Sequence, residues 1–144
     1  MSLPNFHKVS DELYRGGQPD RRGFEDLTKM VIRTTINLRS FHTDYFYLRG
    51  LPLVNHHLWM KAWHPEYEDI RQFLTIMAVA KLKGELPVCV HCALGSERTG
   101  AIVASYRVKV QGWSKEEAIR EMTGPDFGFD PIRGYFMTDF IKKL

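Results

Sequence analysis

The sequence contains very few cysteines, with only Cys89 and Cys92 among its 144 residues. This excludes the disulfide framework that holds many small secreted domains together. The two cysteines do form the Cys-x-x-Cys spacing of redox proteins. Pro87–His91 is predicted to be a buried strand, however, and three extended residues separate α-carbons by about 10 Å, beyond the ~7 Å limit of a disulfide. We therefore interpret Cys89 as a small apolar strand residue.

Long hydrophobic runs are also missing, so the sequence predicts no membrane span and no signal peptide. The sequence also has no large excess of either charge: 20 Lys and Arg residues against 17 Asp and Glu residues give a net charge of +3. This excess does not indicate nucleic-acid binding, but it suits a protein whose ligand is an anion. We expect a cytoplasmic location, and a periplasmic one stays open if a natural leader was removed ahead of Met1.

The sequence shows no repeat, low-complexity tract or linker, and its 44% hydrophobic content is ordinary for a globular protein. We therefore predict one domain over residues 1–144. Strands are expected as a hairpin at Lys8–Tyr14 and at Arg33–Leu38, Leu53–Met60 and Pro87–His91. A helix is expected from about Asp20, with Phe24, Leu27 and Val31 on one face. Further helices are expected at Glu66–Leu82, Thr99–Val110, Ser114–Met122 and Pro131–Lys143. Loops are expected at Ser40–Gly50 and Lys61–Pro65.

This alternation predicts an α/β fold with a central sheet of four to five strands and helices on both faces. Ligands of such domains bind beyond the carboxyl ends of the strands, which points to the residues after His91.

Those residues combine a cysteine, a glycine and an arginine in one short loop. They are Cys92-Ala93-Leu94-Gly95-Ser96-Glu97-Arg98-Thr99-Gly100. A cysteine between a strand and a helix start lies among unpaired amides, which stabilise its thiolate. The same amides can cradle phosphate, Gly95 allows an unusual backbone dihedral, and the planar guanidinium of Arg98 can grip two phosphate oxygens. The predicted phosphate-binding residues are Ala93, Leu94, Gly95, Ser96, Glu97 and Arg98.

This loop matches the His-Cys-x5-Arg-[Ser/Thr]-Gly signature of the protein tyrosine phosphatase superfamily, and the chain resembles its compact bacterial dual-specificity branch. Further similar segments are Leu13–Pro19, Ala62–Pro65 and Gly112–Ser114. The resemblance implies that Cys92 attacks phosphorus and that water then hydrolyses the phosphocysteine. It also implies that Arg98 stabilises charge in both steps, that Thr99 helps the thiolate leave, and that His91 anchors the loop. No metal or cofactor is required.

The family usually supplies a general-acid aspartate on a separate loop before the cysteine. The corresponding segment here, from Lys61 to Glu66, contains none. Because a leaving alkoxide needs a proton, we consider other donors. Glu97 is the first candidate, since it resembles a loop aspartate of myotubularin-like lipid phosphatases; alternatively it pairs with Arg98 or is solvated. Asp69 is the second candidate acid, and Glu66 and His64 follow, although carboxylates at a helix start are commonly dipole partners.

The loop interior carries one acid and neither lysine nor histidine. A singly phosphorylated substrate is therefore favoured, as a phosphorylated protein or a small phosphomonoester: phosphotyrosine, or phosphoserine and phosphothreonine. Inositol phosphates and lipid head groups stay open, because Arg15, Arg39 and Lys61 could supply charge around the rim. One alternative function is a module that binds phosphate without turnover. Another is a sulfur-transfer or arsenate-reducing enzyme, and the Arg98-Thr99 pair argues against this second alternative.

Three histidines, His56, His57 and His64, raise the question of a metal site. Adjacent histidines on a strand point to opposite faces, so His56 and His57 cannot readily share one ion. We expect no metal. The sequence says nothing about the oligomeric state.

Overall fold

The computed structural model describes residues 2–144 and contains one five-stranded sheet in the order β1-β2-β5-β3-β4. The strands are β1 (His7–Ser10), β2 (Leu13–Gly16), β3 (Thr34–Asn37), β4 (Val54–His57) and β5 (Val88–His91). β1 and β2 form an antiparallel hairpin, whereas β2, β5, β3 and β4 run parallel. The predicted α/β fold with a sheet of four to five strands is confirmed.

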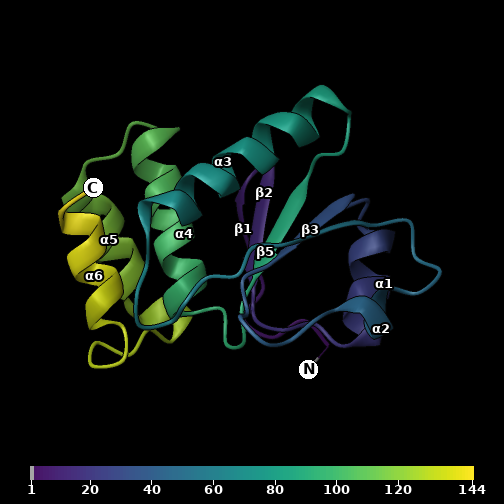
Figure 1. Cartoon of the computed structure of the whole chain (residues 1–144), viewed down its shortest axis with the longest axis horizontal. Helices are drawn as coiled ribbons and strands as arrows, with labels where there is room; N and C mark the ends of the chain where they lie inside the picture. Colours follow the sequence, from purple (N-terminus) through teal and green to yellow (C-terminus); the bar gives the residue numbers. More distant parts are fainter. Residues whose placement is uncertain (1) are drawn as a thin grey trace.

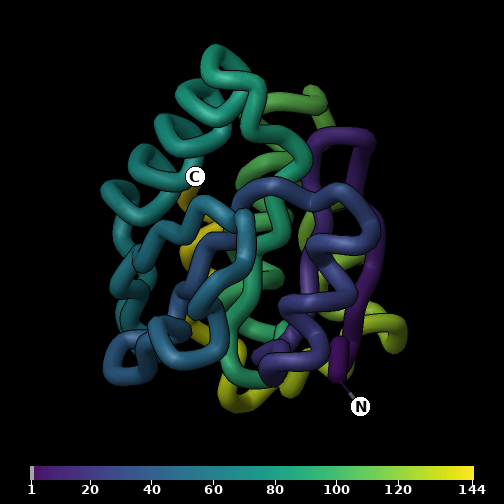
Figure 2. Tube along the Cα trace, turned by 90° about the vertical axis from the view of Figure 1, so that its right-hand side faces the viewer, coloured from purple at the N-terminus to yellow at the C-terminus, as the bar shows by residue number. Residues whose placement is uncertain are grey.

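Helices cover both faces of this sheet (Figures 1 and 2). The helices are α1 (Arg21–Lys29), α2 (Tyr45–Leu48), α3 (Tyr67–Leu82), α4 (Glu97–Lys109), α5 (Lys115–Thr123), the 3-10 turn η1 (Pro125–Phe127) and α6 (Tyr135–Lys142). Figure 1 shows α1 and α2 on one face and α3 to α6 on the other. Within residues 2–144, no helix combines the length and hydrophobicity that a membrane crossing needs.

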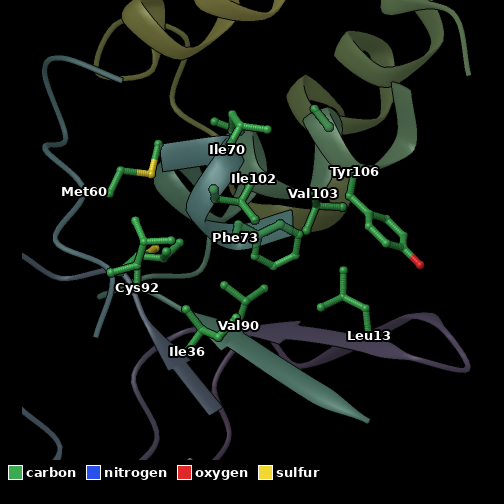
Figure 3. Packing of buried hydrophobic residues seen from close by; sticks show 14 of the residues in the cluster. Leu13, Ile36, Met60, Ile70, Phe73, Val90, Cys92, Ile102, Val103 and Tyr106 are labelled. Carbon is green, nitrogen blue, oxygen red and sulfur yellow. The ribbon is translucent and has the colours of Figure 1, made fainter. Parts of the chain in front are cut away.

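The central strand β5 separates two hydrophobic clusters. All four of its residues are buried, as expected of a parallel strand with helices on both faces. Cys89 points to the smaller cluster, with Phe24 and Leu27 of α1. Val90 faces the larger cluster (Figure 3), where α3 contributes Ile70 and Phe73, α4 contributes Ile102 and Val103, and Cys92 is a member. The loop after β5 therefore begins on a strand that packing holds from both sides.

Helix starts follow the capping signals of the sequence. The carboxylate of Asp20 accepts from the Gly23 amide at the start of α1. Ser114 and Glu117 form a capping box at α5, as predicted. α4 begins at Glu97, two residues before the predicted Thr99, so Glu97 and Arg98 lie in its first turn. This places the unpaired amides of the helix start beside Cys92.

Three expectations were wrong in detail. Val31 is not on the face of α1: it lies past the helix end with φ of 62° and is 58% exposed, and Ile32 takes the buried position. The last helix starts at Tyr135 and not at Pro131, because Asp130 accepts from the amides of residues 132 and 133 and holds them in a turn. The predicted loop Ser40–Gly50 contains the one-turn helix α2.

Candidate active site

The loop after β5 folds around the sulfur of Cys92. The side chain is buried, and its Sγ accepts from the Gly95 amide at 3.2 Å and from the Thr99 hydroxyl at 3.0 Å. Both donors lie where α4 begins, with the positive end of its dipole facing the sulfur. The sulfur therefore lies among hydrogen-bond donors at the start of a helix.

Three successive carbonyls of this loop are bound from outside by the N-terminal segment. The Gln18 amide donates to the carbonyl oxygen of Ala93 at 3.0 Å. Asn5 Nδ2 donates to the carbonyl of Leu94 at 3.1 Å, and Arg15 Nη2 donates to that of Gly95 at 3.0 Å. In a planar trans peptide the C=O and the following N–H point in opposite directions. The amides of residues 94 to 96 therefore turn toward the interior of the loop, as a phosphate cradle requires.

Gly95 is the point where this loop touches the N-terminal segment most closely. Its φ is 80°, a left-handed conformation that glycine adopts without strain. A Cβ at this position would lie 2.6 Å from both the carbonyl carbon of Gly16 and the nitrogen of Gly17. The backbones of Gly16 and Gly17 therefore pack directly against Gly95. The Gly16-Gly17 pair was the feature of the sequence that could have indicated this contact.

Arg15 is buried beneath the loop. The sequence analysis had expected it on the rim of the site. Its residue exposure is 1%, its guanidinium stacks 3.8 Å from the centre of the Phe127 ring, and its Nε has no hydrogen-bond partner in the described residues. Burial lowers the pKa of Arg15 to about 10, so the side chain stays charged at neutral pH. No carboxylate within residues 2–144 forms an ion pair with it.

His91 is held by a carboxylate that the sequence did not reveal. His91 Nε2 lies 2.7 Å from Asp44 Oδ2, and both side chains are fully buried. Gln18 Nε2 donates to the other oxygen of Asp44 at 2.8 Å. Burial acts to raise the pKa of Asp44, but the bonds from His91 and Gln18 outweigh it and hold the pKa below its ordinary value. The predicted anchor His91 is therefore itself fixed by Asp44, just before α2.

A pocket of about 220 Å³ opens over the sulfur. Its lining residues are Ala62, Cys92, Ala93, Leu94, Glu97, Arg98 and Arg133. The structure thus brings the predicted nucleophile and the predicted arginine to one cavity. Ala62, from the segment that corresponds to the acid loop, also lies there. Arg133 was not foreseen, because its segment was predicted to be helical.

Glu97 is the one carboxylate among these lining residues. It does not pair with Arg98: its Oε1 lies 3.4 Å from Arg133 Nε, and its Oε2 accepts from the Asp130 amide at 3.2 Å. Its side chain is 15% exposed, so it is not simply solvated. Glu97 is therefore well placed beside the sulfur, and its role as proton donor stays a prediction.

The other candidate acids lie outside this pocket. Asp69 forms a capping box with Glu66 at the start of α3, where its Oδ2 accepts from the Glu66 amide at 2.9 Å. Burial raises the pKa of Asp69, against the effect of that bond. His64 lines a different pocket, together with Pro65 and Phe136. Both carboxylates therefore lie at a helix start, as in the dipole-partner alternative, and the structure adds that they cap the helix.

Cys89 and the three histidines considered for a metal, His56, His57 and His64, do not line the Cys92 pocket. Cys89 and Cys92 are both free thiols that face opposite clusters, and burial raises the pKa of Cys89 to about 12. The ring of His57 bonds to the carbonyl of Arg39 and stacks on Trp59. Within residues 2–144, no three His, Cys, Asp or Glu side chains are grouped to hold a metal ion.

Comparison with known proteins agrees with this geometry. A family model described as "DSP-PTPase phosphatase fused to NAD+ Kinase" matches residues 2–133. The chain belongs to this dual-specificity phosphatase family. The predicted relationship to compact bacterial members of the protein tyrosine phosphatase superfamily is confirmed.

Individual relatives of this phosphatase family member come from several kingdoms. The chain is 30% identical over 124 residues to the dual specificity protein phosphatase TpbA of Pseudomonas aeruginosa, a match that covers 86% of this chain and 56% of TpbA. It is 30% identical over 123 residues to the inositol diphosphatase DSP5 of Arabidopsis thaliana, covering 82% of this chain and 60% of DSP5. The chain therefore spans less than two thirds of the length of these relatives.

The crystal structure of P. aeruginosa TpbA has the same fold. Its TM-score is 0.87 at 26% identity, over 98% of this chain and 85% of the TpbA chain. A TpbA variant solved in complex with pTyr gives a TM-score of 0.86 at 26% identity, over 96% of this chain and 83% of that chain.

Proposed function

We propose that this chain hydrolyses phosphate monoesters through a phosphocysteine formed on Cys92. The observation that carries the proposal is the hydrogen bonding of one sulfur by the Gly95 amide and the Thr99 hydroxyl, inside a loop whose amides face inward. A thiolate in such a nest is both a nucleophile and a neighbour of a phosphate site. The dual-specificity phosphatase TpbA and its pTyr complex support phosphotyrosine as an accepted substrate.

The first step forms an S–P bond and breaks the ester P–O bond. Cys92 attacks phosphorus in line, while Arg98 and the loop amides stabilise charge on the equatorial oxygens. The leaving oxygen takes a proton, for which Glu97 is the carboxylate in reach of the pocket. In the second step water attacks phosphorus and gives a proton to the Glu97 carboxylate, which restores the acid. The S–P bond breaks, and the Thr99 hydroxyl stabilises the returning thiolate.

Hydrolysis of para-nitrophenyl phosphate tests the proposal, because this leaving group needs little help from an acid. We expect turnover that Cys92→Ser abolishes and Cys89→Ala retains, since Cys89 lies on the other side of β5. Rapid mixing should release nitrophenolate in a burst before steady turnover when hydrolysis of the phosphocysteine is slower than its formation. Turnover that survives Cys92→Ser would refute the mechanism.

The alternative is a module that binds phosphorylated partners without hydrolysing them. It is favoured by Ala62, which occupies the pocket where the family usually offers an acid and which has no proton to give. Under this alternative the protein binds phosphate but leaves para-nitrophenyl phosphate intact, even at high enzyme concentration.

A further inference from the structure

A second pocket of about 380 Å³ adjoins the Cys92 pocket. Its lining residues are Arg39, Ser40, Phe41, His42, Ala62, Trp63 and Arg98. Ala62 and Arg98 line both pockets, so a substrate whose phosphate lies over the sulfur has this second space beside it.

The charge of this pocket is positive and is not neutralised by the protein. No carboxylate is among the lining residues, and within residues 2–144 neither Arg39 nor Arg98 forms an ion pair. Arg133, in contrast, is paired with Glu97 and Asp130. Since Arg98 contacts the phosphate that lies over Cys92, Arg39 is the guanidinium left to attract a second anion, and in a concave space it does so more strongly than a solvated surface cation.

Arg39 is held in place before any ligand arrives. Its Nη1 donates to Gln18 Oε1 at 3.2 Å, and its carbonyl is bound by the ring of His57. Gln18 is in turn fixed on Asp44. A guanidinium that is already oriented loses less entropy when it binds an oxyanion.

The remaining walls include two aromatic side chains and a histidine. Phe41 is 91% and Trp63 58% exposed, so both present rings to a ligand. His42 Nε2 is buried, has no hydrogen-bond partner in the described part of the chain and lies 3.9 Å from Asp44 Oδ1, so it is not counted as a ligand contact. The pocket therefore combines a fixed cation with flat apolar walls, which suits a ligand site.

We propose that this pocket binds an oxyanion carried by the leaving group of the substrate. The inference rests on the proposed function: the phosphate that is hydrolysed lies over Cys92, and a carboxylate or second phosphate on the leaving group contacts Arg39. The preferred substrates are thus aryl-type monoesters with a second negative charge, and Arg39 determines this specificity.

Matched pairs of aryl phosphates test this preference. We would measure kcat/KM for meta- and para-carboxyphenyl phosphate against their neutral methyl esters, and for meta-phenylene bisphosphate against phenyl phosphate. We expect the charged member of a pair to be favoured roughly five- to tenfold, the effect of about one charge-assisted contact at a partly exposed site. The two kinds of pair show whether a carboxylate or a second phosphate is preferred.

Arg39→Gln should bring these ratios close to one, Arg39→Lys should keep part of the preference, and added salt should weaken it. Arg22→Gln removes the same charge from the exposed side of α1 and should leave the ratios unchanged. Because each ratio compares two substrates of one variant, a general loss of activity cancels.

Equal rates within every pair, or a preference that survives Arg39→Gln, would overturn the inference while leaving the proposed function intact. If no ester is hydrolysed at all, the proposed function fails. The same pairs are then compared as dissociation constants on Cys92→Ser protein, where the charged member must still bind more tightly.

Discussion

The guanidinium of Arg15 donates to the carbonyl oxygen of Gly95 at 3.0 Å from a position that is 1% exposed. An arginine buried without a carboxylate partner ordinarily destabilises a fold, because its desolvation is not compensated. Glu121 and the Cys92 sulfur both act on the charge of Arg15, and the loop above it is where a bound phosphate would add further negative charge. We interpret Arg15 as a positioning residue that holds the Gly95 carbonyl outward and faces the anionic site with a positive charge.

Arg15→Met tests this interpretation, because the variant should lose activity without losing stability. Loss of a buried, charge-assisted hydrogen bond of ~1.5–3 kcal/mol should lower kcat for para-nitrophenyl phosphate about 10- to 100-fold. The free energy of unfolding should stay unchanged or rise, since methionine removes an unpaired buried charge. Urea unfolding and steady-state kinetics on the same preparation give both values. Loss of stability in parallel with activity would reduce Arg15 to a structural role.

Gly95→Ala should damage the loop by sterics alone. The substituted residue keeps a φ of 80° only at a cost of about 1–2 kcal/mol, and its Cβ meets the backbone of Gly16 and Gly17. Gly84→Ala is the matched control, because Gly84 has a φ of 69° but no atom within 4 Å of an added Cβ. We expect a larger loss of unfolding free energy for Gly95→Ala than for Gly84→Ala, with loss of activity in the former only. Equal losses would argue against the close contact.

Asp44→Asn should weaken the fold in a pH-dependent way. Because the pKa of Asp44 is depressed in the folded protein, its contribution is fully present above the ordinary value of 3.8 and is lost as pH falls below it. The variant should therefore be less stable by ~3 kcal/mol at pH 7, the scale for one partner of a buried pair, and the gap should begin to narrow as pH falls below 3.8. Urea unfolding across this range measures it.

The control for this prediction is Asp126→Asn, which removes an exposed carboxylate of η1. Its effect on unfolding should be small and should not follow the same pH course. A difference between wild type and Asp44→Asn that stays constant from pH 7 to pH 3 would show that shape, and not charge, makes the residue important.

The nucleophile loop could be predicted because its chemistry is local: Cys92, Gly95, Arg98 and Thr99 lie within eight consecutive positions. Strand β5 and the capping box at α5 were likewise encoded in short patterns. The supports of the loop were not predictable in this way. Asn5, Arg15 and Asp44 reach it only through the pairing of β2 with β5 and the packing of α2, and the sequence alone favours a solvated arginine. The rim position expected for Arg15 was wrong for that reason.

Glu97→Gln addresses the missing acid of the family pattern. If Glu97 protonates the leaving oxygen, the variant should lose about 10²-fold or more on tyrosyl and alkyl phosphates but little on para-nitrophenyl phosphate, whose leaving group needs no proton. If Glu97 instead fixes Arg133 and the Asp130 turn, both substrate classes should lose equally, and Arg133→Met should reproduce the loss. Glu116→Gln, on the exposed side of α5, is the matched control and should leave both rates unchanged. Because Glu97 is the one carboxylate lining the Cys92 pocket, an unequal loss would assign the proton to it and would explain how the site works without an aspartate at the position of Ala62.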